Sequence, residues 1–111
     1  MKIIDTDNAP KAIGTYSQAT KVNGFLFVSG QIPLDPSTME LVEGIENQIN
    51  QVFENINQIL KADGMDFSNV VKLSVLLEDL SHFEKVNEIM ASIFSKPYPA
   101  RSAYEVSKLP K

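Results

Sequence analysis

Apolar side chains return at helical spacing between residues 45 and 60, and this stripe constrains the fold more than any other feature. The stripe follows the pattern i, i+4, i+7, i+8, i+11, i+14 and i+15, and its members are Ile45, Ile49, Val52, Phe53, Ile56, Ile59 and Leu60. Asparagine and glutamine fill much of the opposite face, and Gly64 follows where a helix commonly ends. A helix with one apolar stripe must bury it against a second layer, so we expect a layered domain.

A strand and a second helix are predicted after this first helix. Residues 70–77 (VVKLSVLL) are rich in valine and leucine, which favours a strand that is largely buried. Ser81 and Glu84 have the spacing of a capping box, with a hydroxyl at the N-cap and a carboxylate three residues later. A second apolar stripe then runs as far as Lys96 and Pro97, and it consists of Phe83, Val86, Met90 and Ile93.

Short extended segments surround the two helices. Residues 2–4 can form an edge strand, and another extended segment follows residues 17–19. Asn23-Gly24 is a hairpin signal before the apolar run 25–28, and residues 102–106 form the last extended segment. Residues 31–39 favour a loop or an irregular hairpin. This order predicts an α+β or split βαβ domain with two helices on one face of a sheet. The chain of 111 residues has room for one domain, and the uncovered face of the sheet favours self-association.

Charge and residue usage exclude several classes of protein. The formal net charge is −4 and no run of like charges occurs, whereas nucleic-acid binders cluster lysine and arginine on one face. The chain has no cysteine, which removes disulfides, thiolate metal ligands and thiol nucleophiles. No apolar run approaches the roughly 18 residues of a membrane span, and the N-terminus lacks the apolar core of a signal peptide. We therefore predict a soluble, cytoplasmic protein without a nucleic-acid or membrane partner.

The sequence offers little for metal, nucleotide or triad chemistry. His82 is the only histidine, and the nearby carboxylates of Asp79 and Glu84 are split across a helix start, so we predict no metal site. Ser29 belongs to no nucleophile-elbow motif that would pair it with His82. The five glycines are scattered and form no phosphate-binding loop.

Arg101 is the most informative polar residue, because it is the only arginine in the chain. Pro97 and Pro99 restrict the backbone that leads to it, which suits a side chain aimed in one direction. A guanidinium held in one direction can bind a carboxylate through two parallel hydrogen bonds. The alternative is an ion pair with one of the 14 acidic residues, and the residues alone leave both roles open.

Four other polar residues lie near the predicted ends of elements, and they are Tyr16, Ser29, Gln31 and Asn87. Taken alone, Tyr16 reads as a surface aromatic residue and Ser29 as a turn residue. Asn87 borders the apolar stripe of the second helix, where a hydrogen bond within the fold is the ordinary role of an amide. From the residues alone we infer a pocket for a carboxylate and no named reaction.

The whole chain resembles the RidA/YjgF family of imine deaminases. The segments that carry the resemblance occur in family order and spacing: 8–18 (NAPKAIGTYSQ), 27–33 (FVSGQIP), 70–72 (VVK), 83–87 (FEKVN) and 99–111 (PARSAYEVSKLPK). The resemblance implies a chorismate-mutase-like α+β fold, with a mixed sheet and two helices on one face. It also implies a homotrimer whose three active sites lie in the clefts between subunits.

The resemblance further implies an enzyme that needs no cofactor. Its reaction would be the hydrolysis of 2-aminoacrylate and 2-iminobutanoate, which pyridoxal-phosphate-dependent dehydratases release, to 2-keto acids and ammonia. Carried over by motif, Arg101 would be the catalytic residue that holds the substrate carboxylate. Tyr16, Ser29, Gly30 and Asn87 would line the pocket, with Tyr16 reaching in from a neighbouring subunit.

Two departures from the family pattern are visible. Ala103 stands where many relatives have a cysteine, so we expect no thiol-dependent behaviour. Relatives continue past the Leu-Pro-Lys motif with an interior strand whose glutamate is thought to position the hydrolytic water. Residues 1–111 form a single RidA-like domain without that strand, and we expect the natural chain to continue past Lys111.

Two other functions compete with deamination. A trimeric binding module could hold a 2-keto acid or similar small carboxylate without turning it over, and the absent glutamate favours this alternative. Ribonuclease or translation-inhibitor activity is known for some relatives, but the net charge of −4 argues against an RNA substrate.

Overall fold

The computed structural model describes residues 1–111, which form two units, Met1–Met65 and Asp66–Lys111. The first unit contains an antiparallel sheet of β1 (Lys2–Ile4), β2 (Ala19–Val22) and β3 (Phe25–Val28), in that order. β2 and β3 form the predicted hairpin. Both turn residues have positive φ, 51° at Asn23 and 80° at Gly24, which is the backbone that an Asn-Gly turn adopts between twisted strands.

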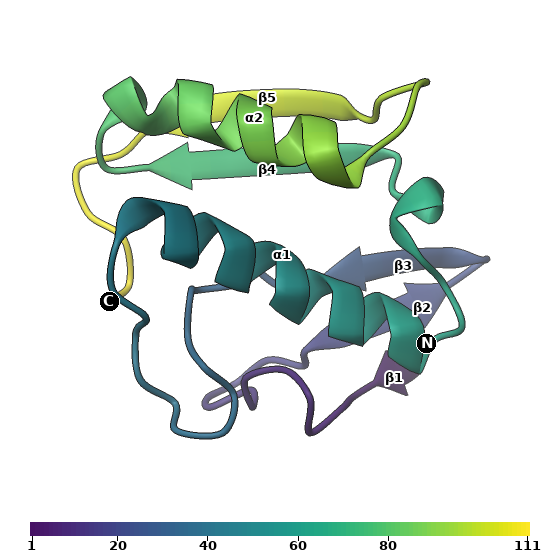
Figure 1. Cartoon of the computed structure of the whole chain (residues 1–111). Coiled ribbons are helices and arrows are strands. Elements are labelled where there is room, and N and C mark those ends of the chain that lie inside the picture. The colour runs from purple at the N-terminus through teal and green to yellow at the C-terminus, as the bar shows by residue number, and fades with distance from the viewer. The chain divides into compact units, whose positions relative to one another are not determined.

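The long helix α1 (Ile45–Ala62) supplies the second layer of this unit (Figure 1). It confirms the predicted helix and begins after Gly44, whose φ is 88°. Ile59 of α1 packs with apolar side chains from one face of the sheet and from the loop after β1, and the members are Ile4, Ala9, Ala19, Leu26 and Val28. The stripe read from the sequence therefore forms part of this unit's core, and the loop 29–44 carries only an isolated bridge between Leu34 and Leu41.

The second unit contains a two-stranded parallel sheet of β4 (Lys72–Leu77) and β5 (Ala100–Glu105). α2 (Phe83–Ile93) forms the connection between these strands and runs alongside both of them (Figure 1). Two single-turn 3₁₀ helices, Phe67–Asn69 and Leu80–His82, precede β4 and α2. β5 begins two residues earlier than predicted, and Arg101 lies within it, opposite Leu73 of β4.

Two local predictions for this unit were wrong. β4 is not largely buried, because α2 covers only one face of a two-stranded sheet; Leu77 is its single buried residue, while Leu76 is half exposed. The capping box at Ser81 does not form either. Asp79 instead accepts a hydrogen bond from the Ser81 backbone and caps a 3₁₀ turn, from which α2 continues without a side-chain cap at His82.

The presence of two helices and five strands confirms the predicted α+β class. The single mixed sheet that the resemblance implied is not found in residues 1–111, because no strand of β1–β3 pairs with β4 or β5 and the strands form two sheets. In each unit one helix covers one face of the sheet. No helix is both long enough and apolar enough to cross a membrane.

Candidate functional site

Arg101 lies against α2, and three side chains of that helix contact its guanidinium. Nη1 donates a hydrogen bond of 2.6 Å to Oδ1 of Asn87 and approaches Sδ of Met90 at 3.6 Å. The guanidinium carbon lies 4.6 Å from the centre of the Phe83 ring. Phe83, Asn87 and Met90 are spaced i, i+4 and i+7, so they form one stripe of α2 that faces the start of β5.

The guanidinium is held by neutral partners. No acidic side chain of the second unit forms an ion pair with Arg101, and the salt bridge of this unit joins Lys85 and Glu88. A guanidinium has five N–H donors in a planar fork, and only those of Nη1 have partners here. The positive charge is therefore uncompensated within the unit, and the Nε and Nη2 donors have no hydrogen-bond partner within it. Such an arrangement is suited to an anion that can accept two parallel hydrogen bonds.

Ser29 and Gly30 follow β3 in the first unit. The Ser29 hydroxyl donates to the Ser17 carbonyl at 2.6 Å, and its backbone N–H donates to the Gln18 carbonyl at 2.9 Å. These bonds fix the end of β3 against the segment that enters β2. Gly30 is exposed, and a Cβ built on it would meet nothing within 4 Å. The space beside this backbone is therefore open in the isolated chain.

Tyr16 lies on the loop that precedes β2, and about half of its surface is exposed. Its hydroxyl accepts a hydrogen bond from the Ile13 backbone at 3.3 Å. Gly14 has a φ of 130°, and a Cβ there would lie 3.5 Å from the Tyr16 ring. The hydrogen bond between Ile13 and the Tyr16 hydroxyl thus closes this loop, while the Tyr16 ring remains exposed at the surface.

The buried side chain of Gln18 holds the segment 6–10 in place, a role that the sequence did not predict. It is 2% exposed, and its side-chain amide holds residues 6–10 through four hydrogen bonds. Oε1 accepts from the Thr6 N–H, and Nε2 donates to the carbonyls of Thr6, Ala9 and Pro10. The only signal in the sequence was its place at the end of the motif 8–18, because a glutamine before a strand is ordinarily exposed.

The predicted site residues therefore fall into two groups. Asn87 and Arg101 meet in the second unit, where the amide accepts from the guanidinium. Ser29, Gly30 and the loop of Tyr16 belong to the first unit, where Ser17 and Gln18 link them. His82 lies half buried at the start of α2, and no three His, Cys, Asp or Glu side chains are grouped to hold a metal ion.

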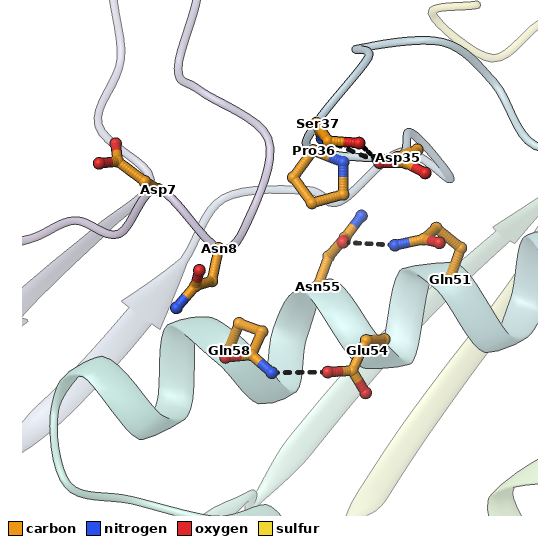
Figure 2. A pocket seen from close by; sticks show the side chains of 9 residues that line it. All are labelled: Asp7, Asn8, Asp35, Pro36, Ser37, Gln51, Glu54, Asn55 and Gln58. Carbon is orange, nitrogen blue, oxygen red and sulfur yellow. Dashed lines mark hydrogen bonds between the residues drawn. The ribbon is translucent and has the colours of Figure 1, made fainter.

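A separate hollow of about 560 Å³ lies in the first unit, between α1 and two loops (Figure 2). None of the predicted site residues lines it; its lining is Asp7, Asn8, Asp35, Pro36, Ser37, Gln51, Glu54, Asn55 and Gln58. The amides of its α1 side are already bonded, since Gln51 donates to Asn55 and Gln58 donates to Glu54 (Figure 2). The fully buried Asn55 also donates to the carbonyls of Ile32 and Leu34 and so fixes the loop 31–42. The polar lining of this hollow mainly holds the loops in place.

Comparison with known proteins identifies the family. Residues 6–111 match the family described as Endoribonuclease L-PSP, and the chain belongs to this family, which includes the RidA and YjgF proteins. The 2-iminobutanoate/2-iminopropanoate deaminase of Rattus norvegicus is 50% identical over 111 residues, which cover 99% of this chain and 81% of that protein.

Solved structures agree with this assignment over the whole chain. The crystal structure of RidA from the Antarctic bacterium Psychrobacter sp. has a TM-score of 0.97 and 51% identity, covering 100% of this chain and 90% of that chain. TdcF of E. coli, solved with bound serine, has a TM-score of 0.94 and 37% identity, again covering 100% and 90%. The family and the α+β fold expected from the five sequence segments are confirmed.

Proposed function

We propose that this protein is an imine and enamine deaminase. It hydrolyses 2-aminoacrylate and 2-iminobutanoate, which dehydratases release, to 2-keto acids and ammonia. The observation that carries the proposal is the uncompensated guanidinium of Arg101, held against α2 in a chain half identical to a named deaminase. A 2-imino acid presents the carboxylate that this guanidinium is built to hold.

The reaction asks little of the protein beyond orientation. An enamine such as 2-aminoacrylate tautomerises to the imine, and a protonated imine is already a strong electrophile. Water adds to the imine carbon, a proton passes to nitrogen, and the C–N bond breaks to release ammonia and leave the keto group. Binding the carboxylate restricts the substrate to one orientation, which lowers the entropic part of the barrier. No metal, cofactor or covalent nucleophile enters this scheme.

Each predicted site residue has a place in the proposal. Arg101 contacts the substrate carboxylate and is the catalytic residue in that sense. Ser29 and Gly30 contribute backbone and hydroxyl groups at an open stretch of chain after β3, and Asn87 lies beside the guanidinium. Tyr16, exposed on its own loop, supplies an aromatic wall to the pocket.

We further propose that the protein assembles as a homotrimer with sites between subunits, in which Tyr16 reaches the pocket of a neighbour. The sheet faces that their helices leave uncovered support this idea. In the first unit, the exposed fractions of Phe25 and Phe27 are 61% and 60%, and Ile3 and Val22 share their face. Apolar faces of this kind favour burial against another copy, and light scattering at micromolar concentration tests for a mass three times that of the chain.

The binding-module alternative keeps the same pocket without turnover. It is favoured by the structure of TdcF with bound serine, a small carboxylate that is not an imine. Retained binding of 2-oxobutanoate without any imine hydrolysis would select this alternative. We also propose that the protein acts in the cytoplasm without an RNA partner, since short-lived imines must be met where they are released.

The decisive experiment measures the loss of 2-aminoacrylate generated by a serine dehydratase, with and without the protein. We expect acceleration in wild type and a loss of about 100-fold or more in kcat/KM for Arg101→Ala, because a charged, doubly hydrogen-bonded contact disappears. Arg101→Lys keeps the charge but loses the fork, so it should recover only part of the activity. Lys108→Ala removes an exposed cation of the same unit and serves as the matched control. Decay no faster than in buffer for wild type contradicts the proposal.

A further inference from the structure

The side chains around Arg101 differ in what they can do for a substrate. Phe83 offers only a ring face, Met90 a buried thioether and Asn87 one amide. The Asn87 oxygen already accepts the short 2.6 Å bond from Nη1. The Asn87 amide oxygen is therefore bonded to Arg101, and it contributes to substrate binding by orienting the guanidinium.

The donors left on the guanidinium define one edge. Nη1 directs its hydrogens to Asn87 and Met90, so Nε–H and Nη2–H remain as a pair on the opposite side of the fork. This pair has the spacing to donate to both oxygens of one carboxylate. The guanidinium carbon lies over the Phe83 ring, 4.6 Å from its centre, so the ring stabilises the cation without using its N–H donors.

The neutrality of the three partners is the second argument. An aspartate at position 87 could accept the same bond, but its charge would compensate the guanidinium and compete with an incoming carboxylate. An asparagine oxygen orients the guanidinium and leaves its charge for the ligand. The aromatic ring likewise stabilises a cation without neutralising it.

Resting on the proposed function, we propose that Phe83 and Asn87 are positioning residues for Arg101. They hold the guanidinium in one orientation so that its Nε–Nη2 edge receives the substrate carboxylate. Asn87 thus acts through Arg101, and Phe83 joins the functional residues.

The first test uses the fact that Arg101 is the only arginine in the chain. Its guanidinium gives a single set of side-chain ¹⁵N signals in the intact protein. We expect slowed rotation about the Cζ–Nη bonds in wild type and faster rotation in Phe83→Leu and in Asn87→Ala. This measurement needs no substrate, so it reports on the positioning even if the protein is not a deaminase.

The second test separates binding from turnover. Phe83→Leu should raise KM for 2-iminobutanoate and the inhibition constant of 2-oxobutanoate about two- to fivefold, with kcat changed less. Phe83→Tyr keeps the ring face and should restore wild-type values. Phe67→Leu makes the same change in a ring that contacts Phe94 in this unit, and it should leave both constants unchanged.

The third variant, Asn87→Asp, distinguishes positioning from general structure. We expect both constants to rise about tenfold or more while the melting temperature stays level or rises, because the new carboxylate pairs with Arg101. Wild-type constants in Phe83→Leu and Asn87→Asp, in a protein whose wild type does deaminate, would refute the positioning and leave the function standing. A wild type that neither deaminates nor binds 2-oxobutanoate would refute the proposed function, and equal guanidinium dynamics in all variants would independently refute the positioning.

Discussion

The buried amide of Gln18 offers the sharpest test of how the first unit holds the loop of Tyr16. The change Gln18→Leu keeps a side chain of similar size and removes all four hydrogen bonds to residues 6–10. The Thr6 N–H and the carbonyls of Ala9 and Pro10 then lose their partner in a region that water reaches poorly. The loop between Pro10 and Gln18 also loses the bond that closes it.

The expected cost follows from these contacts. The two N–H groups of Nε2 are shared among three carbonyls, so about three full hydrogen bonds of about 1 kcal/mol net each are lost. Leaving buried backbone groups without a partner costs about 1 kcal/mol more, and the added apolar burial of leucine returns about 1 kcal/mol. We therefore expect the free energy of unfolding to fall by about 3 kcal/mol. That is a large share of the roughly 5–15 kcal/mol of a typical domain, and it corresponds to a melting temperature about 10 °C lower.

Urea denaturation at one fixed protein concentration measures this cost, because assembly makes apparent stability depend on concentration. Gln31→Leu is the matched control, since Gln31 is half buried and donates one bond, to the Ser29 carbonyl at 3.1 Å. We expect it to lose about 1 kcal/mol or less. If Gln18→Leu loses no more than Gln31→Leu, the assignment of Gln18 as the anchor of residues 6–10 is wrong.

Two further predictions concern charge. Lys21→Met removes the partner of Asp63, whose side chain is 5% exposed and lies 2.9 Å from the lysine nitrogen. We expect the free energy of unfolding, measured by urea denaturation, to fall by about 2–3 kcal/mol. The matched change Lys61→Met, at an exposed site of α1, should cost much less. Three aspartates, Asp35, Asp66 and Asp79, accept hydrogen bonds from a nearby serine hydroxyl and backbone N–H, which lower their pKa below the ordinary value of 3.8 in the folded protein. Their contribution to stability is therefore present above pH 3.8 and is lost as the pH falls through the lower pKa values of the folded state. Urea midpoints measured from pH 7 down to pH 3 should show this loss, and Asp66→Asn should reduce it; an identical acid profile in the variant would contradict the assignment.

Local patterns predicted the elements well where one side of the chain is apolar. The stripe from Ile45 to Leu60 gave the correct helix, and Asn23-Gly24 gave the correct hairpin. Such patterns depend on residues that are close in sequence, whose geometry the backbone itself determines. The capping-box prediction at Ser81 was wrong because two side chains within one turn, those of Asp79 and Ser81, can each act as a cap, and Asp79 is the one that does so.

The candidate site was predicted unevenly. The resemblance singled out Arg101 and Asn87, and the structure brings their side chains together, although their roles remain predictions. Phe83 was read only as a core residue of the second stripe, because a ring that packs on a helix and a ring that covers a cation have the same spacing in sequence. Gln18 was missed because only the folded loop reveals that its amide faces three carbonyls.

The sequence by itself determined the family, the amphipathic helices, the hairpin and the presence of a single arginine behind two prolines. Only the tertiary structure decided what that arginine meets. β4 and β5 pair in parallel with Leu73 opposite Arg101, and this register brings the guanidinium to Phe83 and Asn87 on α2. Register depends on contacts between segments far apart in the chain, and no spacing within one segment specifies it.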